Sequence, residues 1–244
     1  MRHAYALYIL FGVASAATAA CSSASEPAPV HGTAIDHGRD LFHDRATSSS
    51  ASNAFSCATC HAAESADPAG TARVLPGGML AGATLRTTFW GGQENDLLRS
   101  INDCRLFFMD AARPWTSDDE DARAIYAYLA SLASAGGAPI AFTRVDAIVD
   151  LPAGDAAAGE AVFREACVTC HGGVHDGQGR IASFVPRLPD DVIVTHGNGA
   201  RLRLVFIEKV RHGAFVSGGS MAPFSREALS DDRLAALLAY LQLY

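Results

Sequence analysis

The pentapeptide CATCH occupies residues 57–61 of this chain, and a second pentapeptide, CVTCH, occupies residues 167–171. Each holds two cysteines three positions apart, followed at once by a histidine. In a helix such cysteines lie one turn apart on the same face, so each motif presents two neighbouring thiols. The two motifs use four of the six cysteines in a chain of 244 residues. The residues concerned are Cys57, Cys60, His61, Cys167, Cys170 and His171.

This spacing is typical of covalent haem attachment. Two thiols one turn apart can add to the two vinyl groups of a haem, and the next residue, a histidine, is then held under the iron as proximal ligand. The sequence therefore predicts two covalently attached haem c groups. A four-thiolate zinc site or disulfide redox pairs would use the same cysteines. Both alternatives leave the two histidines unexplained, so haem is the favoured interpretation.

A shared plan surrounds the two motifs. Each is preceded by a Gly-x-x-x-Phe pattern and followed, far downstream, by Ser-Asp-Asp and then a Tyr-Leu pair. Apolar positions recur every three or four residues in these flanks, which predicts amphipathic helices, and no strand-rich stretch is long enough for a sheet. We therefore expect an all-α fold. Asp155, Ser117 and Ser230 are the expected N-caps of three of its helices.

With these features, both copies resemble class I c-type cytochrome domains, and residues 35–244 together resemble a dihaem cytochrome c. The resemblance implies that the Gly-x-x-x-Phe helix of each copy crosses its closing helix. Glycine suits such a crossing because two backbones approach most closely where no Cβ intervenes. The implied contacts are Gly38 and Phe42 with Tyr128 in the first copy, and Gly159 and Phe163 with Tyr240 in the second.

The amino terminus predicts export. A short basic start precedes an apolar run, residues 4–20, that ends in small residues and fits a secretory signal peptide better than a membrane-spanning helix. Cys21 follows directly, as in a bacterial lipoprotein cleavage site, although Thr18 stands where that pattern usually has leucine. We expect a lipid on Cys21 that attaches the protein to a membrane from the periplasm. Ordinary cleavage, leaving Cys21 a free thiol, is the alternative.

The expected organisation follows from these features. It comprises a signal peptide (1–20), a flexible tether (21–33), a first cytochrome c domain (34–137), a linker (138–152) and a second cytochrome c domain (153–244). Hydrophobic residues make up 49% of the chain and charged residues 18%, which excludes a wholly disordered protein. The net charge of −7 argues against a nucleic-acid partner and favours docking on a basic patch of a redox partner protein.

Met221 is the expected distal ligand of the second haem. It lies in GGSMAPF, residues 218–224, just before the closing helix. That segment is similar to the loop that supplies the distal methionine in class I cytochromes, except that Ala222 stands where proline is common. Histidine and methionine together raise the reduction potential and leave no open coordination position, which describes an electron carrier.

The distal ligand of the first haem is open between two residues. Met109 has nearly the same distance to the closing helix as Met221 and is favoured by position. However, residues 101–109, INDCRLFFM, resemble the haem-1 region of thiosulfate dehydrogenases and related sulfur-oxidising cytochromes. That resemblance implies Cys104 as ligand, although the family's Ser-Met-Asn-Gly run is replaced by Phe-Met-Asp-Ala here. A third interpretation makes Cys104 a structural cysteine on an apolar helix stripe.

Two functions remain in competition at this stage. The leading one is a dihaem c-type cytochrome that relays single electrons in a periplasmic or membrane-associated respiratory chain. The alternative is a thiosulfate dehydrogenase-like oxidoreductase, with Cys104 on haem 1 as catalytic centre. Arg86, Arg99 and Arg105 would then hold an anionic substrate, whereas in a carrier they would neutralise haem propionates. A dihaem peroxidase is disfavoured because the chain shows no clear labile histidine ligand.

Overall fold

The computed structural model describes residues 33–64, 72–132 and 138–243. The predicted signal peptide, Cys21 and all of the tether before Thr33 lie outside these residues. Within the described ranges there are helices and loops but no strand, only two isolated bridges that pair Ala62 with Met79 and Phe89 with Glu94. The predicted all-α fold is confirmed.

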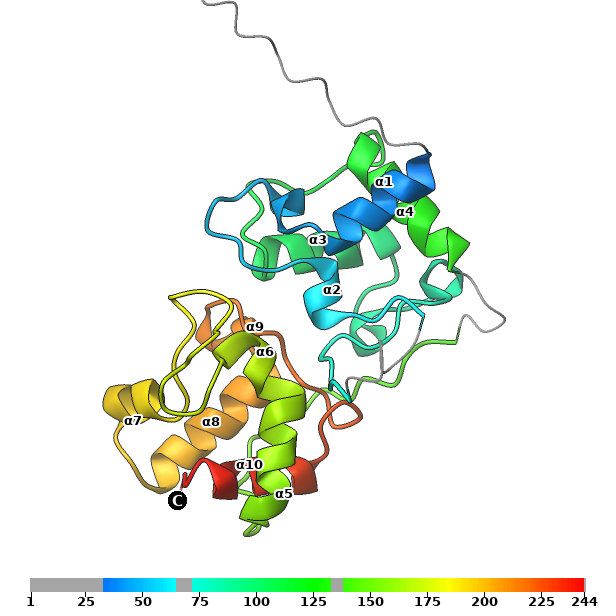
Figure 1. Cartoon of the computed structure of the whole chain (residues 1–244). Coiled ribbons are helices and arrows are strands. Elements are labelled where there is room, and N and C mark those ends of the chain that lie inside the picture. Colours follow the sequence, from blue (N-terminus) through cyan, green and yellow to red (C-terminus); the bar gives the residue numbers. More distant parts are fainter. Residues whose placement is uncertain (1–32, 65–71, 133–137, 244) are drawn as a thin grey trace, which may run out of the picture. The chain divides into compact units, whose positions relative to one another are not determined.

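The helices fall into two sets along the chain (Figure 1). We call residues 33–132 the N-terminal half and residues 138–243 the C-terminal half. The N-terminal half contains α1 (Ala34–His43), η1 (Arg45–Ser48), α2 (Cys57–Cys60), η3 (Ala83–Leu85), η4 (Trp90–Gly92), α3 (Leu97–Phe107) and α4 (Glu120–Ser131). The C-terminal half contains α5 (Ala156–Val162), a π-helical turn η5 (Phe163–Cys167), α6 (Val168–His171), α7 (Asp190–His196), α8 (Ala200–His212), α9 (Ala214–Ser217) and α10 (Asp231–Tyr240).

In the N-terminal half, α1 packs across α4 (Figure 1), and Gly38 lies at the point of contact. A Cβ atom on Gly38 would lie 2.0 Å from the carbonyl oxygen of Ala124 and 2.7 Å from the Cβ of Tyr128. No side chain fits between the two helices at this position. Because glycine has none, the two backbones can come into contact. One turn later the rings of Phe42 and Tyr128 pack with centroids 5.6 Å apart. The implied contact of Gly38 and Phe42 with Tyr128 is present.

The C-terminal half repeats this crossing with α5 and α10. A Cβ atom on Gly159 would lie 2.0 Å from the carbonyl oxygen of Ala236 and 2.7 Å from the Cβ of Tyr240. The rings of Phe163 and Tyr240 are 5.8 Å apart. The same sequence pattern therefore produces the same local geometry twice.

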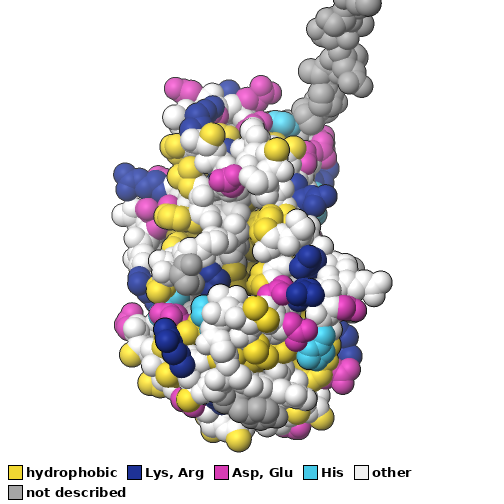
Figure 2. Space-filling view, turned by 90° about the vertical axis from the view of Figure 1, so that its left-hand side faces the viewer, with side chains coloured by type: hydrophobic (Ala, Val, Ile, Leu, Met, Phe, Trp, Pro, Cys, Tyr) yellow, Lys and Arg dark blue, Asp and Glu magenta, His cyan; other side chains and the backbone are white. Residues whose placement is uncertain are grey.

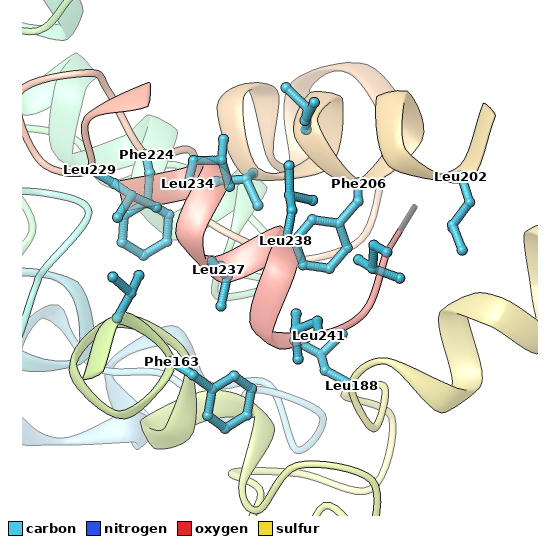
Figure 3. Close-up of a cluster of buried hydrophobic side chains, with 14 residues drawn as sticks. Phe163, Leu188, Leu202, Phe206, Phe224, Leu229, Leu234, Leu237, Leu238 and Leu241 are labelled. Carbon is cyan, nitrogen blue, oxygen red and sulfur yellow. The ribbon is translucent and has the colours of Figure 1, made fainter. Parts of the chain in front are cut away.

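The C-terminal half has the larger apolar core (Figure 3). Leu234, Leu237 and Leu238 of α10 are almost fully buried, and Phe206 of α8 packs against them. These three leucines recur every three or four residues, so they share one face of α10. Burial of each contributes about 1.5–3 kcal/mol.

Two of the three expected N-caps are confirmed. Oγ of Ser230 accepts the N–H of Arg233, and Oδ1 of Asp155 accepts the N–H of Ala157. Ser117 is not an N-cap, because α4 begins only at Glu120 and Asp119 precedes it. The difference comes from Asp119, whose carboxylate accepts the Thr116 N–H at 2.6 Å and pairs with Arg113. This turn occupies the residues that would otherwise form the first turn of a helix capped by Ser117.

Charged side chains of both signs are interspersed on the surface. On the face in Figure 2, Lys and Arg side chains alternate with Asp and Glu side chains rather than gathering in one patch. None of the helices in the described ranges combines the length and apolar character needed to cross a bilayer.

Candidate haem sites

The first cysteine pair lies on a helix of a single turn, α2. Ser56 precedes it and donates its backbone N–H to Oγ1 of Thr59 at 3.0 Å, and the N–H of His61 donates to the carbonyl of Cys57 at 2.9 Å. These bonds close the turn, so Cys57 and Cys60 sit one turn apart with His61 directly after them. The local geometry suits attachment of two thiols to one ring system, with the histidine beneath it.

The ring of His61 is fixed in one orientation. Its Nδ1 lies 3.2 Å from the carbonyl oxygen of Gly78, and because that oxygen accepts, Nδ1 carries the proton and Nε2 is left to bind a metal. A Cβ atom on Gly77 would lie 2.3 Å from Cε1 of the same ring, so glycine there lets the backbone pack against the imidazole. Burial lowers the pKa of His61 and favours its neutral, ligating form.

The second histidine is held in the same way. Nδ1 of His171 donates to the carbonyl oxygen of Pro186 at 2.9 Å, which again leaves Nε2 free of the proton. Burial lowers the pKa of His171 as well. The π-helical turn η5 leads into this motif and widens the helix just before Cys167. Turns of this kind are frequent at functional sites.

A large pocket adjoins the first motif. Cys57, Cys60 and His61 line it together with Cys104 and Met109, which come from the end of α3 and the loop after it. Further lining residues include Ala222 and Pro223 of the C-terminal half. Both candidate distal ligands of haem 1 therefore lie in the pocket that holds the proximal histidine. The third interpretation, in which Cys104 is a structural cysteine on the apolar face of its helix, is compatible with the same position.

The thiols in this pocket are protonated without a metal. Burial raises the pKa of Cys57 to about 11, and it raises the pKa of Cys104 further, helped by the nearby thiols of Cys57 and Cys60. Thiolate ligation through Cys104 would therefore depend on a cation that displaces its proton.

Three buried donors on the pocket wall match the anionic edge of a haem. Nε of Arg86, Nε1 of Trp90 and Nε of Arg105 are buried without a hydrogen-bond partner within the described residues, and all three residues line the pocket. A buried donor without a partner costs about 1–3 kcal/mol. Two propionates, which are anionic acceptors, would remove this cost, so the residues present fit a haem.

Arg105 shows this most clearly. Only 5% of the surface of Arg105 is exposed to solvent. Its guanidinium stacks on Trp115, 3.7 Å from the ring centre. Its Nη1 donates hydrogen bonds to Oδ1 of Asn102 and to the carbonyl of Arg113. No ion pair of Arg105 occurs in the described part of the chain. A buried cation needs an anion beside it.

The three arginines predicted near haem 1 do not all reach the pocket. Arg86 and Arg105 line it, whereas Arg99 is exposed and lies outside its wall. The expectation that all three gather there is therefore corrected.

The loop that carries Met221 folds back on the end of α8. The N–H of Ala214 donates to the carbonyl of Met221 at 2.8 Å, and Nζ of Lys209 donates to the carbonyl of Gly213 at 3.3 Å. A Cβ atom on Gly213 would lie 2.4 Å from the Met221 carbonyl oxygen, so a side chain there would clash with the loop. The φ angle of Gly213 is +57°, a conformation that also favours glycine. Met221 and Cys167 pack against the same apolar core of the C-terminal half.

Two buried polar side chains tie the loops that follow α3 and α8 to those helices, and no sequence motif singles out either of them. Asn102 of α3 donates to the Trp115 carbonyl at 2.9 Å and accepts the Trp115 N–H at 2.7 Å. Arg211 of α8 donates to the carbonyls of Phe224 and Leu229. Asn102 lies two residues before Cys104, and Arg211 lies two residues before Gly213. That matching position in the two copies is the signal that could have revealed them.

The alternatives to haem gain no support from the geometry. Among the described residues, no three or more His, Cys, Asp or Glu side chains converge as they would around a metal ion. None of the five described cysteines is paired in a disulfide.

Comparison with known proteins addresses the C-terminal half directly. Residues 154–241 match the family model of cbb3-type cytochrome c oxidase subunit III. The match supports a c-type cytochrome. It spans the Gly159 crossing, the second Cys-x-x-Cys-His motif and the Met221 loop, so the features described for this half lie within the matched residues. A cytochrome c domain implies covalently bound haem c, and the match therefore supports an electron-transfer haem protein.

No curated protein matches the sequence. Among solved structures, the chain is similar to thiosulfate dehydrogenase (TsdBA) from Marichromatium purpuratum in its "as isolated" form, with 18% sequence identity and a TM-score of 0.40. The alignment covers 90% of this chain and 47% of the other, so the chain spans about half the length of that protein. At this identity and score the similarity carries no conclusion about activity.

Proposed function

We propose that the protein is a dihaem c-type cytochrome that relays single electrons between redox partner proteins. The observation that carries the proposal is the duplicated ligand geometry. At each Cys-x-x-Cys-His motif, the histidine donates Nδ1–H to a backbone carbonyl, that of Gly78 or Pro186, and so presents Nε2 as a ligand. The same helix crossing supports each motif.

The chain's own residues would hold each group and shield it. Cys57 and Cys60 would attach haem 1, with His61 as proximal ligand. Arg86, Trp90 and Arg105 would bind its propionates, because their unpartnered N–H groups already line the pocket. A bound haem supplies an iron that takes up and releases one electron without a proton. The mainly apolar pocket walls exclude water and thereby limit solvent rearrangement on electron transfer.

The second site would be a closed electron-transfer centre. Cys167 and Cys170 would attach haem 2, with His171 as proximal and Met221 as distal ligand. The Gly213 turn and the hydrogen bond from Nζ of Lys209 to the carbonyl of Gly218 hold the Met221 loop in place. A preorganised loop favours a fixed ligand, and a fixed methionine keeps the potential high.

Location and partners complete the proposal. The signal peptide and Cys21 would place the protein in the periplasm, anchored by a lipid, with donor and acceptor proteins docking on it. Its net charge of −7, together with four haem propionates, favours partners with a basic surface patch.

Haem stoichiometry tests this proposal. The full chain should be produced with a haem-attachment system and purified from the periplasmic or membrane fraction. We expect two haems per chain by pyridine haemochrome assay and intact mass, and two one-electron waves in a redox titration. One haem per chain would contradict the dihaem proposal.

A second candidate function is favoured by the position of Cys104 in the haem-1 pocket. Ligation by its sulfur would lower the potential of that haem and give a thiosulfate dehydrogenase-like oxidoreductase. Arg86 and Arg105 would then face a sulfur anion as well as the propionates. In this case Cys104 would be the catalytic ligand and haem 2 the electron exit.

Spectroscopy of Cys104 and Met109 variants separates the two functions. If the protein is a carrier, the oxidised wild type and Cys104→Ala give the same methionine-type low-spin signals by EPR and near-infrared magnetic dichroism. In that case Met109→Leu, which changes little volume, removes one of the two methionine bands. A thiolate-type signal that disappears only in Cys104→Ala would instead establish the enzyme, and thiosulfate would be the first substrate to assay.

A further inference from the structure

A short segment, Arg73–Val74, contacts the first haem-attachment motif and the turn that leads into the second. Nη2 of Arg73 donates to the carbonyl of Thr59 at 3.3 Å, and Thr59 lies between Cys57 and Cys60. Arg73 is half-buried. This side chain is therefore attached to the backbone of the first motif.

Val74 makes a matching contact just before the second motif. Its N–H donates to the carbonyl of Glu165 at 2.9 Å, two residues before Cys167 and inside the π-helical turn η5. Its side chain packs against the apolar core of the C-terminal half. Glu165 is itself anchored, since its carboxylate pairs with Arg233 of α10. Two adjacent residues thus connect the two motifs through a pair of hydrogen bonds.

The charge of Arg73 lies close to both motifs. Its guanidinium donates to the backbone inside the first motif, and the next residue, Val74, donates to Glu165, two residues before Cys167. A cation held in this position acts on both attachment points.

We propose that Arg73–Val74 is a bridge that holds the two haem-attachment motifs at a fixed separation, and that the Arg73 side chain sets the reduction potentials of both haems together. The inference rests on the proposed function, because it needs a haem at each motif. With a haem held at each motif, transfer of one electron across the bridge would oxidise one iron from Fe(II) to Fe(III) and reduce the other from Fe(III) to Fe(II). No proton and no third reactant are needed.

The electrostatic consequence has a definite sign. A nearby cation stabilises the reduced state, which carries one positive charge fewer, so Arg73 raises both potentials. Because both rise together, the driving force between the haems changes little. Arg73 instead shifts the reduction potentials of both haems relative to those of the external donor and acceptor.

Removing the charge while keeping a hydrogen-bond donor tests this bridge. In Arg73→Gln, we expect the ratio of reduced to oxidised haem at a fixed potential to fall about three- to tenfold at both haems. A tenfold change equals 59 mV for one electron. Arg73→Lys keeps the charge and should stay close to wild type. Arg39→Gln, which removes an exposed arginine of α1 paired with Asp36, is the matched control and should move neither haem.

The titration is made on full-length protein by spectroelectrochemistry, after the haem content of each variant has been measured. A shift at haem 1 alone would overturn the bridge, since Arg73 would then act only through Thr59. An equal shift in Arg39→Gln, or no shift in Arg73→Gln with both haems present, would overturn it too. If wild type carries a single haem, the proposed function fails instead, so the two failures are distinguishable.

Discussion

Replacing Cys167 and Cys170 together with alanine is expected to leave the chain with one haem in place of two, and the same replacement of Cys57 and Cys60 should remove the other. Attachment needs both thiols of a motif beside the histidine, and a ring without its thioether bonds is held only by the ligands and the pocket. Haem per chain, measured by pyridine haemochrome assay and intact mass, should fall from two to one in each double variant. Each should lose one of the two redox waves.

The fifth described cysteine provides the control. Cys104→Ala should keep two covalently bound haems, because Cys104 belongs to neither motif, whichever residue is the distal ligand of haem 1. Loss of both haems in either double variant, with the helical circular dichroism retained, would contradict independent attachment. Stoichiometric zinc in place of haem would contradict the interpretation of the motifs themselves.

The second large effect is expected at the α5–α10 crossing. Gly159→Val places two methyl groups where even a Cβ atom would lie 2.0 Å from the Ala236 carbonyl oxygen, so the helices must separate. Overpacking of this kind costs about 3 kcal/mol or more in the free energy of unfolding. Gly159→Ala gains up to about 1 kcal/mol in helix propensity but meets the same carbonyl, so it too should destabilise the protein.

Ala158 offers a matched control on the same helix, since it is exposed. Ala158→Val introduces the same β-branched side chain and should cost only about 0.5 kcal/mol. Chemical denaturation of the haem-loaded protein, followed by far-ultraviolet circular dichroism, compares the three variants. If Gly159→Val were no less stable than Ala158→Val, the close approach of the two helices would not exist. Gly38→Val should reproduce the effect at the α1–α4 crossing.

The features that could be predicted from the sequence are short-range or repeated. Cys57 and Cys60 lie within one helical turn, and a spacing of three residues has only one outcome in a helix. Gly38 with Phe42, and Gly159 with Phe163, are likewise one turn apart, and each pair recurs at corresponding places in two copies. The resemblance to class I cytochromes then supplied the partners Tyr128 and Tyr240, and the contacts are present.

Local competition misled the prediction where two short-range interactions were available. Ser117 is the expected cap because acidic residues follow it, as they follow Ser230 in the second copy. In the structure, Arg113 and the Thr116 N–H occupy the Asp119 carboxylate and delay the start of α4 to Glu120. An N-cap contributes about 0.5–2 kcal/mol, so one ion pair and one turn hydrogen bond are enough to move the start of a helix.

The sequence by itself determined the helical class and the two attachment motifs, since each depends on residues a turn apart or on a pattern that occurs twice, and the resemblance to class I cytochromes added the helix crossings. Only the tertiary structure brought Cys104 and Met109 into one pocket, left Arg99 outside it while burying Arg105, and placed Arg73 between the two motifs. The physical reason is distance along the chain. Burial of a side chain and the field of a charge depend on segments that meet only after the helices have packed, and no local spacing encodes which segments meet.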